Sequence, residues 1–217
     1  RLAAFYAERA RHGVALIVTG GVAPAPSGVG MEGGAVLNDA SQLPHHRIVT
    51  DAVHREGGKI ALQILHTGRY SYQPNLVAPS ALQAPINRFK PHALTHDEIL
   101  ALIDDFARCA ALAREAGYDG VEVMGSEGYL INEFLAARTN QRDDEWGGDY
   151  ARRMRFAVEV VRAVRERAGA DFIIVFRLSM LDLVEGGGTF DETVQLAQAI
   201  EAAGAPIINT GIGWHEA

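Results

Sequence analysis

The residues that could carry acid–base chemistry follow two apolar strands that lie far apart in the sequence. The run 121–124 leads into a loop with Glu127 and Tyr129, and the run 206–210 leads to His215. A tyrosine with an ordinary pKa of about 10 stays protonated at neutral pH, and it can give its proton to a carbanion that forms nearby. A lone loop tyrosine is more often a packing residue. The two loops together predict Tyr129 and His215 as a proton-donor pair, with Glu127 as a supporting group.

Two polar side chains interrupt or end strands that are otherwise apolar. Gln63 lies within the run 59–65, and Arg177 directly follows the run 172–176. Buried amides and guanidinium groups need partners. An amide and a guanidinium at two strand ends suit the polar edge of a flavin pyrimidine ring. The alternatives are a structural hydrogen bond for Gln63 and an intramolecular ion pair for Arg177.

The remaining histidines and the single cysteine give weaker signals. His66 and Arg69 either contact a phosphate or fix their loop. The histidines expected on the second helix should be solvated, and their spacing predicts no metal site; they are His45, His46 and His54. Cys109 is alone, so neither a disulfide framework nor a cysteine-ligated metal is predicted, and a reducing cytoplasm fits.

Composition narrows the class of partner. The chain has 217 residues, of which 48% are hydrophobic and 22% charged, which is typical of a globular protein. The formal net charge is -7 and no dense basic cluster is present, so we expect no nucleic-acid partner. No apolar run approaches the ~20 residues of a membrane span, so we expect no membrane association and a cytoplasmic location. The sequence does not indicate an oligomeric state.

A helix, a glycine and a short apolar run recur five times, which is typical of helices alternating with parallel strands. The continuous apolar runs indicate strands that are covered on both faces. Each helix should end at its glycine in a left-handed C-cap. The predicted helices are 2–12, 44–56, 95–116, 154–168 and 189–203, and the predicted strands are 14–18, 59–65, 120–124, 172–176 and 206–210.

Loop lengths favour a barrel over a doubly wound sheet. The segments 20–38, 66–94 and 125–149 follow strands and are long, whereas the turns that follow helices are short. This asymmetry is typical of a (β/α)8 TIM barrel, whose functional face lies at the carboxyl ends of the strands. Residues 28–33 match G-x-G-x-x-G formally, but no helix follows them, so a dinucleotide-binding fold is disfavoured.

Several motifs carry a family resemblance that covers essentially the whole chain. They are 62–69, 77–81, 120–123, 128–135, 139–148 and 213–216. With these motifs the chain resembles the old yellow enzyme family of FMN-dependent ene-reductases, and within it the bacterial NADPH-dependent 2,4-dienoyl-CoA reductases of unsaturated fatty-acid β-oxidation. Typical ene-reductases hold a substrate carbonyl with two histidines, or a histidine and an asparagine, where this chain has Met124 and Glu127.

The resemblance implies roles for particular residues. Tyr129 would donate a proton with His215 as its partner, after reduced FMN delivers a hydride to the distal carbon of the diene. The residues that would contact FMN are Gly21, Gln63 and Arg177. The residues that would lie near the acyl-CoA thioester substrate are Arg138, His215 and Glu216.

The resemblance also implies that residues 1–217 form a single partial TIM-barrel FMN-binding domain, with strands 2 to 6 of the barrel. FAD, a 4Fe-4S cluster and NADPH would belong to the full-length parent, and the isolated segment would hold FMN weakly and turn over poorly. The alternatives are another old-yellow-enzyme-like ene-reductase, an amine dehydrogenase, or a non-catalytic partial barrel. Acyl-chain preference is not indicated.

Overall fold

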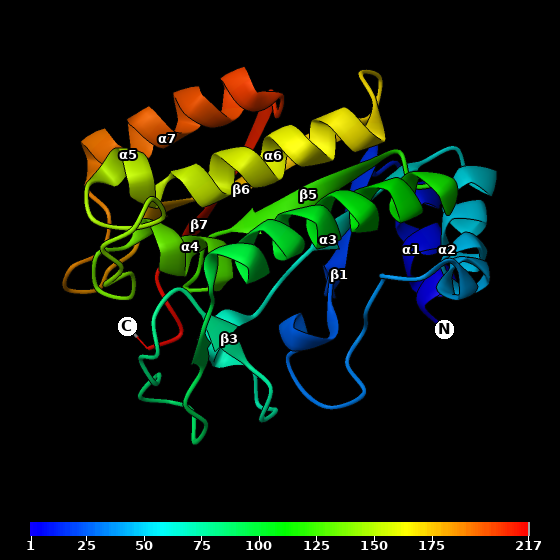
Figure 1. Ribbon diagram of the computed structural model, residues 1–217. Coiled ribbons are helices and arrows are strands. Elements are labelled where there is room, and N and C mark those ends of the chain that lie inside the picture. The colour runs from blue at the N-terminus through cyan, green and yellow to red at the C-terminus, as the bar shows by residue number, and fades with distance from the viewer. Residues whose placement is uncertain (217) are drawn as a thin grey trace.

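The computed structural model describes residues 1–216 and contains a curled five-stranded parallel sheet (Figure 1). All five predicted strands are present, in the spatial order that the chain sequence gives, as in part of a (β/α)8 barrel. The fold class predicted from the sequence is therefore confirmed. The strands are β1 (Leu16–Val22), β2 (Lys59–Ile64), β5 (Gly120–Gly125), β6 (Ile173–Leu181) and β7 (Ile207–Ile212).

The five main helices lie along one face of the sheet, each packed against the next in chain order (Figure 1). Thr95 and Thr189 cap two of them, and each forms the predicted capping box with the glutamate three residues later. The helices are α1 (Leu2–Arg11), α2 (Leu43–Arg55), α3 (His96–Glu115), α6 (Arg155–Ala168) and α7 (Phe190–Ala203).

The core fills the layer between these helices and the sheet. Phe106 of α3 and Phe156 of α6 meet edge to face there, and both are fully buried. Phe134 stacks on Phe156 with ring centroids 4.3 Å apart. This packing fixes the helices on the strands, so the strand ends form a rigid base for the loops that follow them. The strand residues of this core with no exposed surface are Ile60, Leu62, Ile64, Val121, Val123, Ile174 and Phe176.

The expected helix ends are confirmed in position but only partly in conformation. The glycine after each of the five helices has a positive φ, at residues 13, 57, 117, 169 and 204. Four of these glycines, at residues 13, 57, 117 and 204, close a left-handed C-terminal cap, in which the backbone N–H groups of the glycine and of the next residue donate back to the last helical turn. Gly169 differs, because it caps α6 with an extended ψ of 167°. The prediction of a left-handed cap is therefore confirmed at four helices and was wrong at Gly169.

The long loops contain short elements that the sequence analysis did not predict. The strands β3 (Val77–Ala78) and β4 (His92–Ala93) pair in parallel within the loop after β2. The helix α4 (Leu130–Leu135) directly follows Tyr129, and α5 (Tyr150–Arg153) precedes α6. Three 3-10 turns complete the loops: η1 (Pro26–Gly28), η2 (Ala40–Gln42) and η3 (Gly68–Tyr70).

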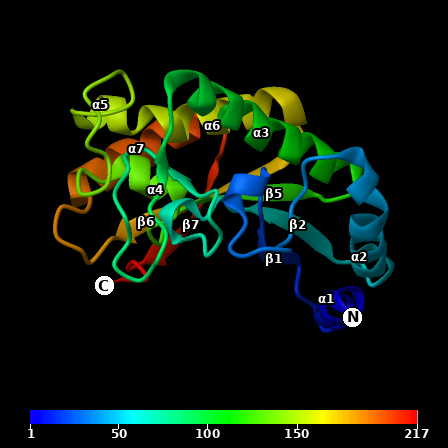
Figure 2. The same ribbon diagram turned by 60° about the horizontal axis from the view of Figure 1, so that its bottom comes forward.

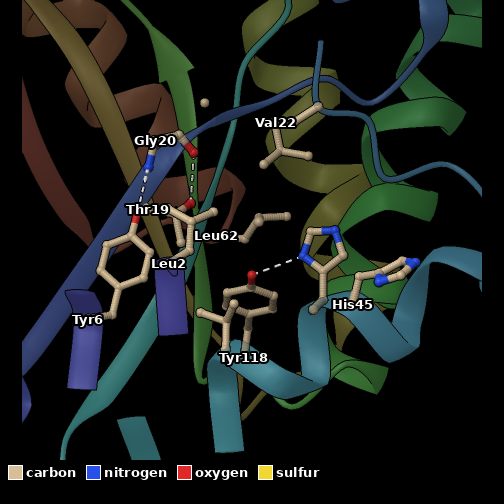
Figure 3. Close-up of a pocket in the computed structure, with 12 residues that line it drawn as sticks. Leu2, Tyr6, Thr19, Gly20, Val22, His45, Leu62 and Tyr118 are labelled. Carbon is tan, nitrogen blue, oxygen red and sulfur yellow. Dashed lines mark hydrogen bonds between the residues drawn. The ribbon is translucent and has the colours of Figure 1, made fainter. Parts of the chain in front are cut away.

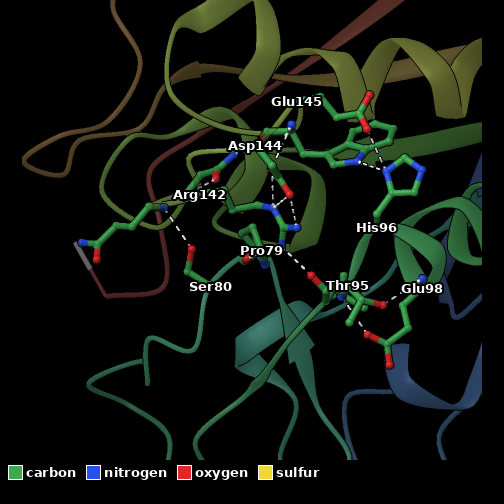
Figure 4. Close-up of polar contacts among 12 residues, drawn as sticks. Pro79, Ser80, Thr95, His96, Glu98, Arg142, Asp144 and Glu145 are labelled. Carbon is green, nitrogen blue, oxygen red and sulfur yellow. Dashed lines mark hydrogen bonds and ion pairs between the residues drawn. The ribbon is translucent and has the colours of Figure 1, made fainter.

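Two of the motifs that carried the family resemblance build one structural contact rather than a catalytic one. Arg142 donates to the carbonyl oxygen of Pro79 at 2.9 Å and is paired with Asp144 (Figure 4). The Trp146 indole donates to His96 at the start of α3. Arg142 thus joins the loop after β5 to the β3–β4 loop.

No helix within residues 1–216 is long and apolar enough to cross a membrane. The strands β1 and β7 form the two edges of the sheet. Ile207 and Ile212 of β7 are 45% and 59% exposed. The edge strand therefore presents apolar side chains outside the core.

Candidate active site

The loops after β1, β2, β5 and β7 converge at the carboxyl ends of the strands, the face that Figure 2 brings forward. Hydrogen bonds join these loops directly. Thr67 donates from its backbone to Gly28 at 3.1 Å, and Leu130 donates to the carbonyl oxygen of His66 at 3.1 Å. This is the face at which the sequence analysis expected the functional residues.

Tyr129 and His215 meet on this face, as predicted. The His215 Nε2 atom lies 2.8 Å from the Tyr129 hydroxyl, and the two ring centroids are 5.1 Å apart. Burial raises the pKa of the Tyr129 phenol, the Glu127 carboxylate raises it further, and Arg177 opposes them. The phenol therefore holds its proton at neutral pH, as a proton donor must.

Glu127 pairs with Arg177 and does not bond to Tyr129. The Arg177 Nε and Nη2 atoms donate to one Glu127 oxygen at 3.1 and 2.7 Å. Glu127 has a φ of 65°, a left-handed conformation that is unusual for a residue other than glycine. The ion pair considered as an alternative for Arg177 is present. Arg177 also lies inside β6, which continues to Leu181, so its placement directly after a strand was wrong.

Gln63 belongs to a hydrogen-bonded row across the inner face of the sheet. Its amide nitrogen donates to Glu122 Oε1 at 2.8 Å, and the Asn209 amide donates to the other Glu122 oxygen at 2.7 Å. Glu122 is only 1% exposed, so both of its oxygens accept a bond in a dry environment. This row fixes the Gln63 side chain and leaves its amide oxygen as the group available to a ligand.

Two of the three predicted FMN contacts suit a flavin ring in their chemistry. Gln63 offers an amide oxygen, and Arg177, with 27% of its side chain exposed, offers a cation. An acceptor and a cation are groups that the polar edge of a flavin pyrimidine ring can bond. Gly21 is the neighbour of Gln63 in the β1–β2 register, but a Cβ atom there would lie 2.8 Å from Leu65, so this side of the glycine is already packed.

His66 and Arg69 fix their loop, since both are buried, at 2% and 4% exposure. The His66 Nδ1 atom accepts from the Gly68 backbone at 3.1 Å, so its Nε2 carries the proton toward Ser27. Burial lowers the pKa of His66 to about 3. A neutral, enclosed imidazole is a structural group, and the phosphate alternative finds no support here.

Arg138 and Glu216 lie at the edge of the same site. Arg138 has 33% of its side chain exposed, and its Nη2 atom lies 3.6 Å from Glu216 Oε2. The Glu216 side chain is only 2% exposed and bonds to Arg69 and Tyr70. Arg138 is therefore partly open to solvent, while the Glu216 side chain is enclosed behind the Tyr129–His215 pair.

An open hollow of about 520 Å³ adjoins the Tyr129–His215 pair. Most of its lining surface is apolar. The hollow therefore provides an apolar volume beside the Tyr129–His215 pair, of the kind that small-molecule ligands occupy. The residues that line it are Gly30, Met31, Thr67, Tyr70, Tyr72, Ile86, Tyr129 and His215.

A second hollow, of about 340 Å³, lies between β1 and the helices α1 and α2 (Figure 3). His46 and His45 line it, and the His46 Nδ1 atom lies 3.0 Å from the Tyr118 hydroxyl. Burial lowers the pKa of His46. The expectation that this histidine is solvated was wrong, because the exposed side of α2 lies one position away, at His45.

Sequence reasoning missed three residues of the site. Glu122 was taken as part of an apolar strand, and Tyr70 and Glu133 were not considered. Glu133 is fully buried and accepts from the Arg69 backbone at 2.8 Å. A charged residue inside a strand and another inside an apolar helix were the signals that could have found two of them. Residues 1–216 contain no group of three or more histidine, cysteine or acidic side chains placed to hold a metal ion.

Comparison with known proteins shows which family this chain is similar to. The NADH:flavin oxidoreductase / NADH oxidase family model matches residues 1–217. A metal reductase of Desulforamulus reducens is 41% identical over 225 residues, which cover 100% of this chain and 33% of that protein. The chain thus spans a third of the length of that curated relative.

Two solved structures are similar to this chain over nearly its whole length. A 2-naphthoyl-CoA reductase in complex with 2-naphthoyl-CoA matches with a TM-score of 0.93 and 33% identity, covering 99% of this chain and 35% of that one. An old yellow enzyme homologue from Zymomonas mobilis matches with a TM-score of 0.87 and 30% identity, covering 98% of this chain and 63% of that one.

Proposed function

Because this chain belongs to the NADH:flavin oxidoreductase / NADH oxidase family, we propose that it is the FMN-binding barrel of an NADPH-dependent 2,4-dienoyl-CoA reductase. Residues 1–217 would act as one FMN-binding unit. The observation that carries the proposal is the Tyr129–His215 contact of 2.8 Å beside an apolar hollow. A phenol held protonated beside an imidazole is suited to protonating the carbanion of an ene reduction.

The chain's own residues would divide the work as follows. Gly21, Gln63 and Arg177 would hold the flavin, and FMN when bound supplies the hydride that adds to the distal carbon of the diene. Tyr129 would then protonate the resulting dienolate, so that one hydride and one proton give the enoyl-CoA. His215 would return a proton to the phenolate across the 2.8 Å contact.

The proposed substrate class rests on the side chains that flank the Tyr129–His215 pair. The side chains at positions 124 and 127 are a methionine and a glutamate held by Arg177, so neither provides the neutral donor pair that clamps a small enone carbonyl. His215 is exposed and lines the hollow, and Arg138 is partly exposed; both would face the thioester. The 2-naphthoyl-CoA reductase with its bound thioester supports a CoA ester as substrate.

In the whole protein, FAD and a 4Fe-4S cluster would carry electrons from NADPH to FMN. The chain spans a third of the length of one curated relative, which leaves room for such domains in a longer protein. We propose a cytoplasmic location, which the single unpaired cysteine of this chain fits.

The proposal is tested by presenting the NADPH-reduced whole protein with four acceptors: a 2,4-dienoyl-CoA, the pantetheine-free dienoate, cyclohexenone and 2-naphthoyl-CoA. Flavin reoxidation is followed for each. We expect the dienoyl-CoA to give the highest kcat/KM. A preference for cyclohexenone would favour a general ene-reductase. Reduction of the oxidised flavin by N-methyl amines, measured separately without NADPH, would favour an amine dehydrogenase. A whole protein without bound flavin would leave a non-catalytic barrel as the remaining reading.

A further inference from the structure

A buried group of charged and aromatic side chains lies behind the Tyr129–His215 pair. Arg69 Nη2 donates to Glu216 Oε1, and the Tyr70 hydroxyl donates to the same oxygen at 3.0 Å. The Arg69 and Glu216 side chains are 5% and 2% exposed. Glu216 directly follows His215, so these two bonds tie the loop after β7 to the loop after β2.

The aromatic members of this group enclose the loop that carries Tyr129. The Tyr70 ring lies edge to face with Tyr129 at 6.1 Å and with His215 at 5.4 Å. A Cβ atom at Gly128 would lie 2.6 Å from the Tyr70 ring and 2.9 Å from Trp214. Tyr70 and Trp214 therefore press on the Tyr129 loop from two sides, and only glycine leaves them room.

We propose that Arg69, Tyr70 and Glu216 form a latch that holds His215 on the Tyr129 hydroxyl. Glu216 is then a positioning residue that acts through His215, and it does not touch the substrate. The inference deepens the proposed function and rests on it, since the latch serves the proton transfer assigned to this pair. The latch consists only of side chains of this chain.

The charges within the latch balance. Glu133 is fully buried beneath Arg69, and burial raises its pKa well above the ordinary value for glutamate. Burial thus favours the neutral form of Glu133, and Glu216 is the carboxylate that pairs with the Arg69 guanidinium. Burial, followed by the neighbouring Glu216, raises the pKa of Tyr70, so its hydroxyl remains a donor. Removing the Glu216 charge would leave Arg69 buried beside no anion.

The test compares Glu216→Gln and Tyr70→Phe with Glu201→Gln, which changes an exposed carboxylate on α7. In the whole protein we expect flavin reduction by NADPH to be normal in all three. In Glu216→Gln, kcat for the dienoyl-CoA should fall by about tenfold or more while KM stays close to that of the parent, because a misplaced donor slows chemistry and not binding. Tyr70→Phe removes one of the two bonds and should give a smaller loss of kcat.

The second readout does not depend on activity. In the 15N-histidine-labelled chain, the His215 ring resonances, assigned with His215→Gln, should shift or broaden in Glu216→Gln and Tyr70→Phe but not in Glu201→Gln. Unchanged resonances would overturn the latch, and so would a raised KM at constant kcat, which would mean that Glu216 contacts substrate. If the whole protein does not reduce dienoyl-CoA, the proposed function fails, while the His215 resonances still decide whether the latch exists.

Discussion

Buried and charged side chains are hydrogen-bonded more completely at the amino ends of the strands than at their carboxyl ends. At the amino ends, Asp119 accepts from the Ile60 backbone at 2.9 Å and from Lys59 at 3.1 Å, and His54 lies 2.9 Å away. At the carboxyl ends, residues 1–216 contain four buried polar atoms without a hydrogen-bond partner: Arg69 Nε, Glu133 Oε2, Trp214 Nε1 and Glu216 Oε2.

Backbone strain follows the same division. Within residues 1–216, the residues other than glycine that have a positive φ are Glu127 and Leu183, and each lies in a loop after a strand. Unpartnered polar atoms and strained residues both cost stability. The amino ends are therefore built for stability, and the carboxyl ends retain costs that a purely structural surface would have removed. The contrast locates the functional face without reference to any relative.

Two glycines with similar backbone and different surroundings test this contrast most strongly. Gly128 has a φ of +80° and would bring a Cβ atom within 2.6 Å of Tyr70, whereas Gly57 has a φ of +77° and open space around it. We expect Gly57→Ala to lose only the cost of the left-handed backbone, about 1–2 kcal/mol, and Gly128→Ala to lose about 2–5 kcal/mol. Urea unfolding of both variants measures the difference. Equal losses would mean that the site is no more tightly packed than the opposite end.

Tyr129→Phe isolates the chemistry of the carboxyl ends from their packing. The change removes the hydroxyl that lies 2.8 Å from His215 and keeps the ring. In the whole protein we expect NADPH to reduce the flavin normally and dienoyl-CoA turnover to slow by about 10²-fold or more. Stopped-flow measurement of the two half-reactions separates these steps. Parent-like turnover would remove Tyr129 from the acid role.

The sequence predicted what depends on neighbouring residues. The capping boxes at Thr95 and Thr189 and the glycine after each helix are set by contacts three or four residues apart, and they appear where expected. The strands were predicted by their apolar runs. Short elements such as α4 and the β3–β4 pair were missed, because tertiary contacts and not local pattern stabilise them.

The site was predictable only where a polar residue stood out from its surroundings. Gln63 and Arg177 did so, and Tyr129 was found from its place after a strand. Which residue pairs with which could not be found in this way. Glu122 meets Gln63 across the sheet register, and Glu127 meets Arg177 across a loop. Such pairings depend on which strand lies beside which, and this is set by the whole sheet.

The pH dependence of the stability of Asp119→Asn tests how charge stabilises the amino ends of the strands. Burial acts to raise the pKa of Asp119, but the bonds from His54, Ile60 and Lys59 outweigh it and lower the pKa. A carboxylate with a lowered folded-state pKa stabilises above its unfolded value of about 3.9 and loses that contribution as pH falls through the folded value. We expect Asp119→Asn to cost about 1–2 kcal/mol at neutral pH and less in acid. A cost that grows in acid would show that the charge of Asp119 is not what stabilises this end.

Of these variants, Glu127→Gln should have the smallest effect on turnover. It tests how the charged groups at the carboxyl ends of the strands set the pKa of Tyr129. Burial is the main cause of the raised pKa of Tyr129, the Glu127 carboxylate comes second, and Arg177 opposes both. Removing the carboxylate leaves Arg177 unopposed, so the pKa of Tyr129 should fall toward its ordinary value without reaching neutrality. Turnover at neutral pH should change little, and its alkaline limb should move to lower pH. Ultraviolet difference titration, with Tyr129→Phe as the background, measures the same shift directly. A rise in the pKa would mean that the Glu127–Arg177 pair acts on Tyr129 through its position and not through its charge.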